Sequence, residues 1–274
     1  MNKDALRQMV INQYELNKSI VGDYWALGVT KEGRRINWAR CCAMEGCETV
    51  DSYPWKHWKS LNGKIDTDNV NVELSDIWHF ILSLVIENEL GIYLSKDTSV
   101  KLEHLTGSDI EAIVMEEIMN DIVRTLAAEE YWNTLLVNDL IDAERIEDNI
   151  GDRDSKVNEF PFIEAFVHIA SGLSLKSTLR RPYESRASNV KDLIYIFHEI
   201  CKKVNLDIVE IYYAKTELNK FRQLNGYKDG SYIKIWTVDG VKKEDNVVLL
   251  QLIASGVKVS DILNKLDEIY KSQL

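Results

Sequence analysis

The longest apolar helical pattern of the chain covers residues 70–90, and it limits the folds that are open to this sequence. Its apolar side chains recur at the spacing of a buried helix, and Gly91 directly after it is a typical helix stop. Only three prolines and thirteen glycines interrupt the 274 residues, so long helices meet few breaks. We therefore predict an all-α fold.

The rest of the sequence continues this helical pattern. Pro54 ends one helix, because the residue before a proline avoids the helical region. The glycine-containing stretch 226–240 alternates apolar and polar residues, which predicts a loop or one short hairpin. No repeat divides the chain, so we expect a single domain over residues 1–274. Further helices are expected near residues 4–20, 36–52, 108–131, 133–148, 161–175, 188–204, 206–223, 244–254 and 259–272.

Composition excludes several classes of protein. With 45% hydrophobic and 28% charged residues, the chain has the make-up of a soluble globular protein. Its formal net charge of −11 disfavours general nucleic-acid binding, which needs a basic surface. No uninterrupted apolar run approaches the ~20 residues of a membrane span, and the N-terminus lacks the pattern of a signal peptide. We expect a cytoplasmic protein with no membrane partner.

The four cysteines do not form a recognisable metal motif. Three of them, Cys41, Cys42 and Cys47, lie in "CCAMEGC", which lacks the two spaced pairs of a zinc module, and the fourth is Cys201. In a reducing compartment we expect all four to be small core residues on helices.

Two acidic pairs lie inside apolar helical stretches, where a charge is costly unless something positive meets it. Glu45 and Glu48 are three residues apart and therefore point to the same side of a helix that carries only one other charged residue, Arg40. Glu73 and Asp76 repeat this spacing on the next helix. If the two helices pack antiparallel across Pro54, four carboxylates converge.

Four converging carboxylates need protonation or counterions. Oxygen-only ligands favour hard cations, so Mg²⁺ is the expected ion and Mn²⁺ a substitute for it. The alternative is that each acid pairs with a lysine or arginine, but few cations lie on these helices. We predict a four-helix core that binds metal.

Aromatic and amide side chains near these acids could recognise a base. Trp55 and Trp58 follow Pro54 closely, and indoles stack well on flat heterocycles. The alternative is that both are core or dimer-interface residues. His79 extends the acidic edge by three residues, with a hydrogen-bonded core histidine as its alternative. Gln13 and Asn17 are four apart on the first helix, where surface amides are the common case.

Cations gather near the C-terminus. Lys215, Asn219 and Arg222 share one helical face, and Lys228 and Lys234 follow in the glycine-containing loop. Mobile cations beside metal-binding acids are what a polyphosphate requires. Taken alone the segment could be a solvated face, so its value depends on the acidic pairs.

Together these motifs resemble those of a known family. E-x-x-E at 45–48, "WKHWK", E-x-x-D at 73–76 and "LNKFRQLNGYKDGSYIKIW" are similar to the dimeric all-α dUTP pyrophosphatases, within the all-α nucleoside triphosphate pyrophosphohydrolases. The similarity is spread over residues 13–236. Residues 93–200 match no motif, so a cap-like subregion there stays open.

The resemblance implies hydrolysis of dUTP, and also of dUDP, to dUMP by a homodimer. It implies that four acids bind Mg²⁺, namely Glu45, Glu48, Glu73 and Asp76. It places uracil among Gln13, Asn17, Trp55 and His79, with Trp58 as the alternative to Trp55. The deoxyribose would meet Asn219 and Tyr227, and the phosphates would meet Lys215, Arg222, Lys228 and Lys234.

The expected mechanism is attack by a metal-activated water, which the resemblance directs to the β-phosphorus. We assign Glu48 as the residue that orients or deprotonates this water. One rival is a related pyrophosphohydrolase with another base specificity. A remote rival is a di-iron oxidoreductase, because Asp76 and His79 have the carboxylate–histidine spacing of such sites, although Glu164 and His168 are spaced by four rather than three. A non-catalytic helical interaction protein is the third.

Overall fold

The structure is a computed structural model that describes residues 1–56, 58–59, 63–96, 101–127 and 159–273. Helices dominate these residues, with one two-stranded hairpin, so the all-α prediction is confirmed. The helix expected at 133–148 lies outside the described residues.

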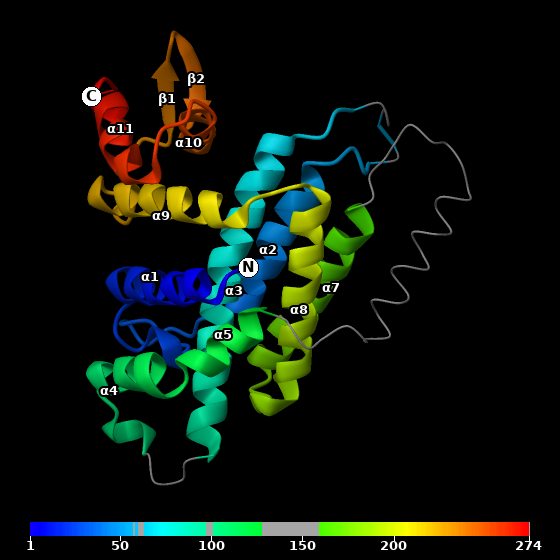
Figure 1. Cartoon of the computed structure of the whole chain (residues 1–274), viewed down its shortest axis with the longest axis vertical. Helices are drawn as coiled ribbons and strands as arrows, with labels where there is room; N and C mark the ends of the chain where they lie inside the picture. Colours follow the sequence, from blue (N-terminus) through cyan, green and yellow to red (C-terminus); the bar gives the residue numbers. More distant parts are fainter. Residues whose placement is uncertain (57, 60–62, 97–100, 128–158, 274) are drawn as a thin grey trace.

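Four helices form the central bundle. They are α2 (Trp38–Asp51), α3 (Thr67–Lys96), α7 (Phe160–Thr178) and α8 (Glu184–Lys203), and α2 contacts both α3 and α7 while α8 contacts both α7 and α3. Figure 1 shows α2 and α3 side by side, with the chain reversing between them as the sequence predicted. The metal-binding acids were expected on this pair.

By length and composition alone α3 could cross a membrane, although polar and charged residues interrupt its apolar sequence. The apolar window of the helix is 72% buried inside the protein. Burial of this kind is typical of the core helix of a globular domain, and the neighbouring helices of the bundle cover it. The apolar length of α3 is therefore explained by its central position.

Two helical glycines mark close contacts in the bundle. A Cβ added to Gly46 on α2 would lie 2.8 Å from the Val167 side chain on α7, so these helices approach too closely for a larger residue. Gly91 was predicted to end its helix, but α3 continues to Lys96. A Cβ at Gly91 would lie 2.3 Å from the Tyr183 ring, so this glycine makes room for an aromatic side chain instead of stopping the helix.

Two helices, α1 (Lys3–Val21) and α9 (Ile208–Leu224), pack against α3 and against each other (Figure 1). The helix expected over 108–131 is broken into α4 (Gly107–Ala112), a π-helical turn (Ile113–Glu117) and α5 (Met119–Ala127). Two 3₁₀ turns, Trp25–Leu27 and Leu102–His104, complete this part.

The C-terminal residues build a small module on α9. The strands β1 (Ile235–Val238) and β2 (Val241–Glu244) pair antiparallel, followed by α10 (Asp245–Ala254) and α11 (Val259–Lys271). The hairpin was expected within 226–240; it begins later because its turn is formed by Asp239 and Gly240, both with positive φ. A second hydrophobic cluster lies here, separate from the main core, and it includes residues of α9. The single-domain division stays a prediction.

The cysteines follow their prediction only in part. Cys42 and Cys201 are buried and Cys41 is half-buried, but Cys47 is exposed on α2. Its helical position turns it away from α3 and α7, so the expectation of four core cysteines was wrong at this residue.

Candidate active site

Three carboxylates converge where α2 packs against α3. Glu45 from α2 and the pair Glu73 and Asp76 from α3 each offer an oxygen, and these oxygens lie within 4.8 Å of one another. The three-residue spacing of the α3 pair turns both side chains to one face, and α2 places Glu45 opposite them. We call these residues the acidic cluster. Its convergence agrees with the geometry expected from the sequence.

The charges of the acidic cluster act on one another. Burial, followed by the repulsion of Asp76 and Glu73, raises the pKa of Glu45 to about 8. Burial also raises the pKa of Glu73, despite an opposing hydrogen bond with Glu45. The cluster is therefore a site that favours a proton or a cation.

One lysine reaches this cluster from another helix. The Lys215 ammonium on α9 lies 2.9 Å from a carboxylate oxygen of Asp76, and the lysine side chain is only 1% exposed. The alternative that acids pair with basic residues is therefore correct for Asp76, through a residue distant in sequence. Because Glu45 and Glu73 keep raised pKa values, one lysine does not neutralise the cluster.

Glu48 lies outside the acidic cluster. It is exposed one turn beyond Glu45 on α2, so the expectation that four acids converge holds for three. Its charge still contributes to the raised pKa of Glu45 and of Glu73. Glu48 also lines a cavity of about 420 Å³ between the end of α2 and the start of α3, where lysine side chains gather: Lys56, Lys59 and Lys64.

A buried polar network lies beside the acidic cluster, among α1, α3 and α9. The Gln13 amide donates to Asn17 Oδ1 at 3.1 Å and to Ser83 Oγ at 3.2 Å, and the Asn17 amide donates to the same serine at 2.8 Å. Both amide residues are buried, so they are not the surface residues that the alternative assumed. Through Ser83, this network connects α3 with Gln13 and Asn17, two of the residues expected to bind uracil.

His79 completes the network. Its Nδ1 donates to Gln13 Oε1 at 2.7 Å, since a carbonyl oxygen can only accept. Burial lowers the pKa of His79 to about 4, so the imidazole is neutral and Nε2 carries a lone pair. Nε2 is buried and has no hydrogen-bond partner among the described residues. A buried acceptor of this kind is costly unless a donor reaches it.

The two tryptophans are neither core residues nor part of this network. Trp55 is 40% exposed and Trp58 is 63% exposed, and their rings make an edge contact with centroids 5.6 Å apart. The Trp55 indole donates to Asp51 at 3.0 Å. Among the described residues, the Trp55 ring contacts the Trp58 ring and the Lys56 ammonium.

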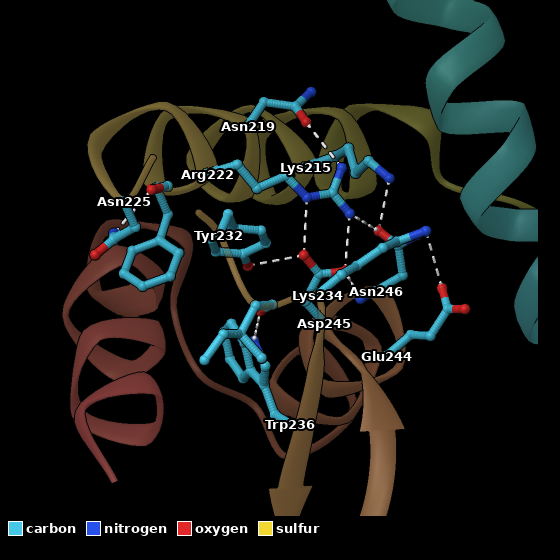
Figure 2. Close-up of polar contacts among 12 residues, drawn as sticks. Lys215, Asn219, Arg222, Asn225, Tyr232, Lys234, Trp236, Glu244, Asp245 and Asn246 are labelled. Atoms are coloured by element: carbon cyan, nitrogen blue, oxygen red, sulfur yellow. Dashed lines mark hydrogen bonds and ion pairs between the residues drawn. The ribbon is translucent and has the colours of Figure 1, made fainter. Parts of the chain in front are cut away.

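Lys215 and Arg222, which we call the cation pair, are held between α9 and α10 (Figure 2). The Arg222 guanidinium donates to both carboxylate oxygens of Asp245 at 2.8 Å, and both residues are largely buried. Asn246 Oδ1 accepts from Lys215 at 2.7 Å and from Arg222 at 3.0 Å. The expectation of mobile cations is therefore wrong for this pair, because each one is fixed by partners.

A family model described as dUTPase matches residues 5–227. The chain belongs to the all-α dUTPase family. This membership confirms the resemblance drawn from the acidic pairs and the "LNKFRQLNGYK" segment, and it makes the protein a nucleotide pyrophosphohydrolase of nucleotide metabolism. No match to the chain is found among curated proteins.

The residues expected at the sugar and phosphates of a dUTPase divide into two groups. Asn219 accepts a long hydrogen bond of 3.4 Å from Arg222, whose guanidinium also lies over the Tyr227 ring, so these three residues are together. Lys228 instead bonds the Ile20 carbonyl at 3.4 Å, and Lys234 pairs with Glu244 at 3.1 Å. Both lysines lie outside the matched range of the dUTPase model.

Sequence reasoning missed three residues of this site. Ser83 lies one turn beyond His79 on the same face of α3, so helical spacing could have found it. Asp245 and Asn246 follow the cations by more than twenty residues, and the sequence signals only a helix start there. Their pairing with the cation pair depends on how α10 packs on α9.

The donor set of the acidic cluster fits a hard divalent cation. Its ligand atoms are all carboxylate oxygens, and the raised pKa of Glu45 reflects like charges that a cation would relieve. The di-iron alternative fits less well, because Glu164 and His168 are exposed on α7 and do not join the cluster.

Proposed function

We propose that this member of the dUTPase family is a Mg²⁺-dependent dUTP diphosphatase that also accepts dUDP, acts as a homodimer and is cytoplasmic. The convergence of Glu45, Glu73 and Asp76 is the observation that carries the proposal. Asp76 of this cluster pairs with Lys215 of the cation pair, and His79 of the buried amide–imidazole network lies one helical turn after Asp76 on α3. A nucleotide has the same order of chemistry: a base, then a chain of phosphates that takes metal ions and cations.

The base is assigned to the network of Gln13, Asn17 and His79. Uracil presents one ring N–H donor between two carbonyl acceptors. His79 Nε2, which has no partner among the described residues, is an acceptor for such a donor. The Asn17 amide keeps one N–H for a carbonyl, while both N–H hydrogens of Gln13 already bond Asn17 and Ser83 and fix the network. Trp55 is exposed and could stack on the base only from outside this network, so its assignment is the least supported by contacts.

Mg²⁺, or Mn²⁺ as a substitute, would be held by Glu45, Glu73 and Asp76, where it would offset phosphate charge and lower the pKa of a water. Asp76 also orients Lys215, which lies at the border between the acidic cluster and α9. Asn219 and Tyr227 are assigned to the deoxyribose, and Arg222 to the phosphates. These cations would stabilise the charge that develops on the phosphates during attack at the β-phosphorus, from which dUMP leaves.

Glu48 is assigned as the group that takes a proton from the attacking water, with the β-phosphorus as its target. Glu48 is exposed, its charge contributes to the raised pKa of Glu45, and it lines the cavity between α2 and α3. An exposed acid beside a metal site can exchange its proton with solvent, which suits a base that must be regenerated.

The test is pyrophosphate release from dUTP with and without Mg²⁺, with dTTP, dCTP and UTP beside it. We expect Mg²⁺-dependent turnover that prefers dUTP, and loss of turnover with retained nucleotide binding in Glu48→Gln. Glu164→Gln, an exposed acid on α7, is the matched control and should turn over normally. Preference for dCTP or UTP would contradict the uracil assignment, and near-normal turnover by Glu48→Gln would contradict its role.

A further inference from the structure

The cation pair is held by two residues that lie beyond the part of the chain matched by the family model. Asp245 and Asn246 begin α10, whereas the matched range ends at residue 227. Asp245 is completely buried, and its position is fixed from a third side by the Tyr232 hydroxyl, which donates to it at 2.8 Å. Figure 2 shows these side chains meeting between α9 and α10.

Within the described part of the chain, Asn246 accepts hydrogen bonds from both cations. Its Oδ1 accepts from Lys215 and from Arg222, so both lone pairs of this oxygen are used. Two positive side chains that share one acceptor repel each other, and the neutral amide oxygen attracts both, in addition to the carboxylates that pair with each of them. An amide does this without cancelling their charge.

A count of donors shows what this arrangement leaves over. Arg222 spends Nε and both Nη2 hydrogens on Asp245 and Asn246, and one Nη1 hydrogen on Asn219. Lys215 spends two of its three hydrogens, on Asp76 and Asn246. Within the described residues each cation keeps one N–H, and its direction is set by the bonds already made.

We propose that Asn246 is a positioning residue that aligns the remaining donors of Lys215 and Arg222 on the phosphates of the substrate. The inference rests on the proposed function. It makes the C-terminal module, which starts beyond the matched family range, a structural part of the phosphate site. Preorganised donors bind more tightly because little ordering is left to be done on binding.

Two variants of the full-length chain test the proposal. Asn246→Ala removes the shared acceptor, so we expect KM for dUTP to rise about tenfold while kcat changes less than about threefold. Asn246→Asp keeps the acceptor oxygen but adds a negative charge beside the cations. We expect its urea midpoint to equal or exceed that of the unchanged protein, while KM rises about tenfold or more.

The second variant separates positioning from support of the fold. If Asn246 only held the two helices together, Asn246→Asp would leave KM unchanged. Gln251→Ala on the exposed side of α10 is the matched control, since the Gln251 side chain accepts a hydrogen bond from Lys243 rather than from the cation pair. Both KM and stability should be unchanged in this variant. A KM within about twofold of normal in Asn246→Asp would overturn the proposal, whether or not Asn246→Ala folds.

A second probe keeps this result distinct from the proposed function. Inorganic tripolyphosphate binding, measured by titration calorimetry with Mg²⁺, needs no nucleotide chemistry. We expect both variants to bind it about tenfold more weakly than the unchanged protein. If the unchanged protein hydrolyses no dUTP, the proposed function fails and this binding series still decides the inference. Equal binding by all proteins, or no binding by the unchanged one, would overturn it.

Discussion

The acidic cluster and the cation pair are both groups of like charge, the first partly buried and the second buried, but their charges are balanced to different extents. Glu45, Glu73 and Asp76 share one protein cation, Lys215, and two of these acids keep raised pKa values. Arg222, in contrast, has a buried carboxylate on two of its nitrogens and an amide oxygen beside it. The protein supplies counter-charge to the cations and leaves the acids short of it.

This difference separates two uses of buried charge. A charge that is fully paired inside the protein contributes to a fixed geometry, and removing its partner is strongly destabilising. A group of like charges that is not paired costs stability, and the cost is recovered when an ion binds. The acidic cluster is a group of like charges that lacks full pairing, whereas Arg222 is a charge that is paired inside the protein.

The largest expected effect is on activity, from a change in the acidic cluster. Glu73→Gln removes one proposed metal ligand, and the loss of several kcal/mol of transition-state stabilisation should lower kcat/KM about 10³-fold. Without Mg²⁺ at pH 8, the same variant should be more stable than the unchanged protein because a repelling charge is gone. Enzyme assays and urea unfolding measure the two effects.

The control for this variant is Glu164→Gln, which should change neither quantity. Lower stability of Glu73→Gln in the absence of metal would mean that the acidic cluster is paired like the cations, and the comparison would fail.

The next effect is on stability, from the cation side. Asp245→Asn leaves Arg222 buried without a full counter-charge, so the free energy of unfolding should fall by about 3 kcal/mol. Urea unfolding measures it, with Asp261→Asn in the exposed first turn of α11 as the matched control. Equal stability of the two variants would show that the Arg222 pairing is as dispensable as a surface ion pair.

The smallest effect concerns Glu87, a buried acid that lies between the two cases. Its ion pair with Arg186 has a long distance of 3.8 Å between the guanidinium nitrogen and the carboxylate oxygen. Burial raises the pKa of Glu87 to about 7, against an opposing contribution from Arg186. The folded state therefore holds this proton between about pH 4.5 and 7 while the unfolded chain releases it, so stability contributed below pH 4.5 is lost as the pH rises towards 7.

Glu87→Gln should remove that loss. Over this pH interval the unfolding free energy of the unchanged protein should fall by about 2 kcal/mol more than that of the variant, as measured by urea unfolding at each pH. Parallel pH curves for the two proteins would show that Arg186 pairs Glu87 as fully as Asp245 pairs Arg222.

The sequence predicted the features that depend on local spacing. Glu73 and Asp76 share a helix face by arithmetic alone, and the apolar neighbours predicted the burial of Glu73, whereas Asp76 is half-buried. It did not predict the ion pair between Asp76 and Lys215, because that contact depends on how α9 crosses α3. Gly91 was misread for the same reason, since the Tyr183 ring that needs the space comes from far along the chain.

Helical spacing alone also could not predict which neighbouring residues join the acidic cluster or pair with the cations. Glu48 shares its helix side with Glu45, but α3 covers only the first of them. The cations on α9 were predicted as phosphate-binding residues by type and spacing, while the positions of their partners Asp245 and Asn246 depend on packing in the second hydrophobic cluster. Local pattern thus located the charges, and tertiary contacts decided which of them were neutralised.

The placement of α9 in both hydrophobic clusters has a practical consequence for anyone who shortens this protein. Cutting the chain at the boundary of the family match would keep all three acids of the acidic cluster, yet it would strip Trp236 and Tyr270 from the far side of Phe221 and leave Arg222 without its carboxylate. The trimmed polypeptide would present an apolar helix face and an orphaned guanidinium to water, so we expect it to be less stable than the whole chain.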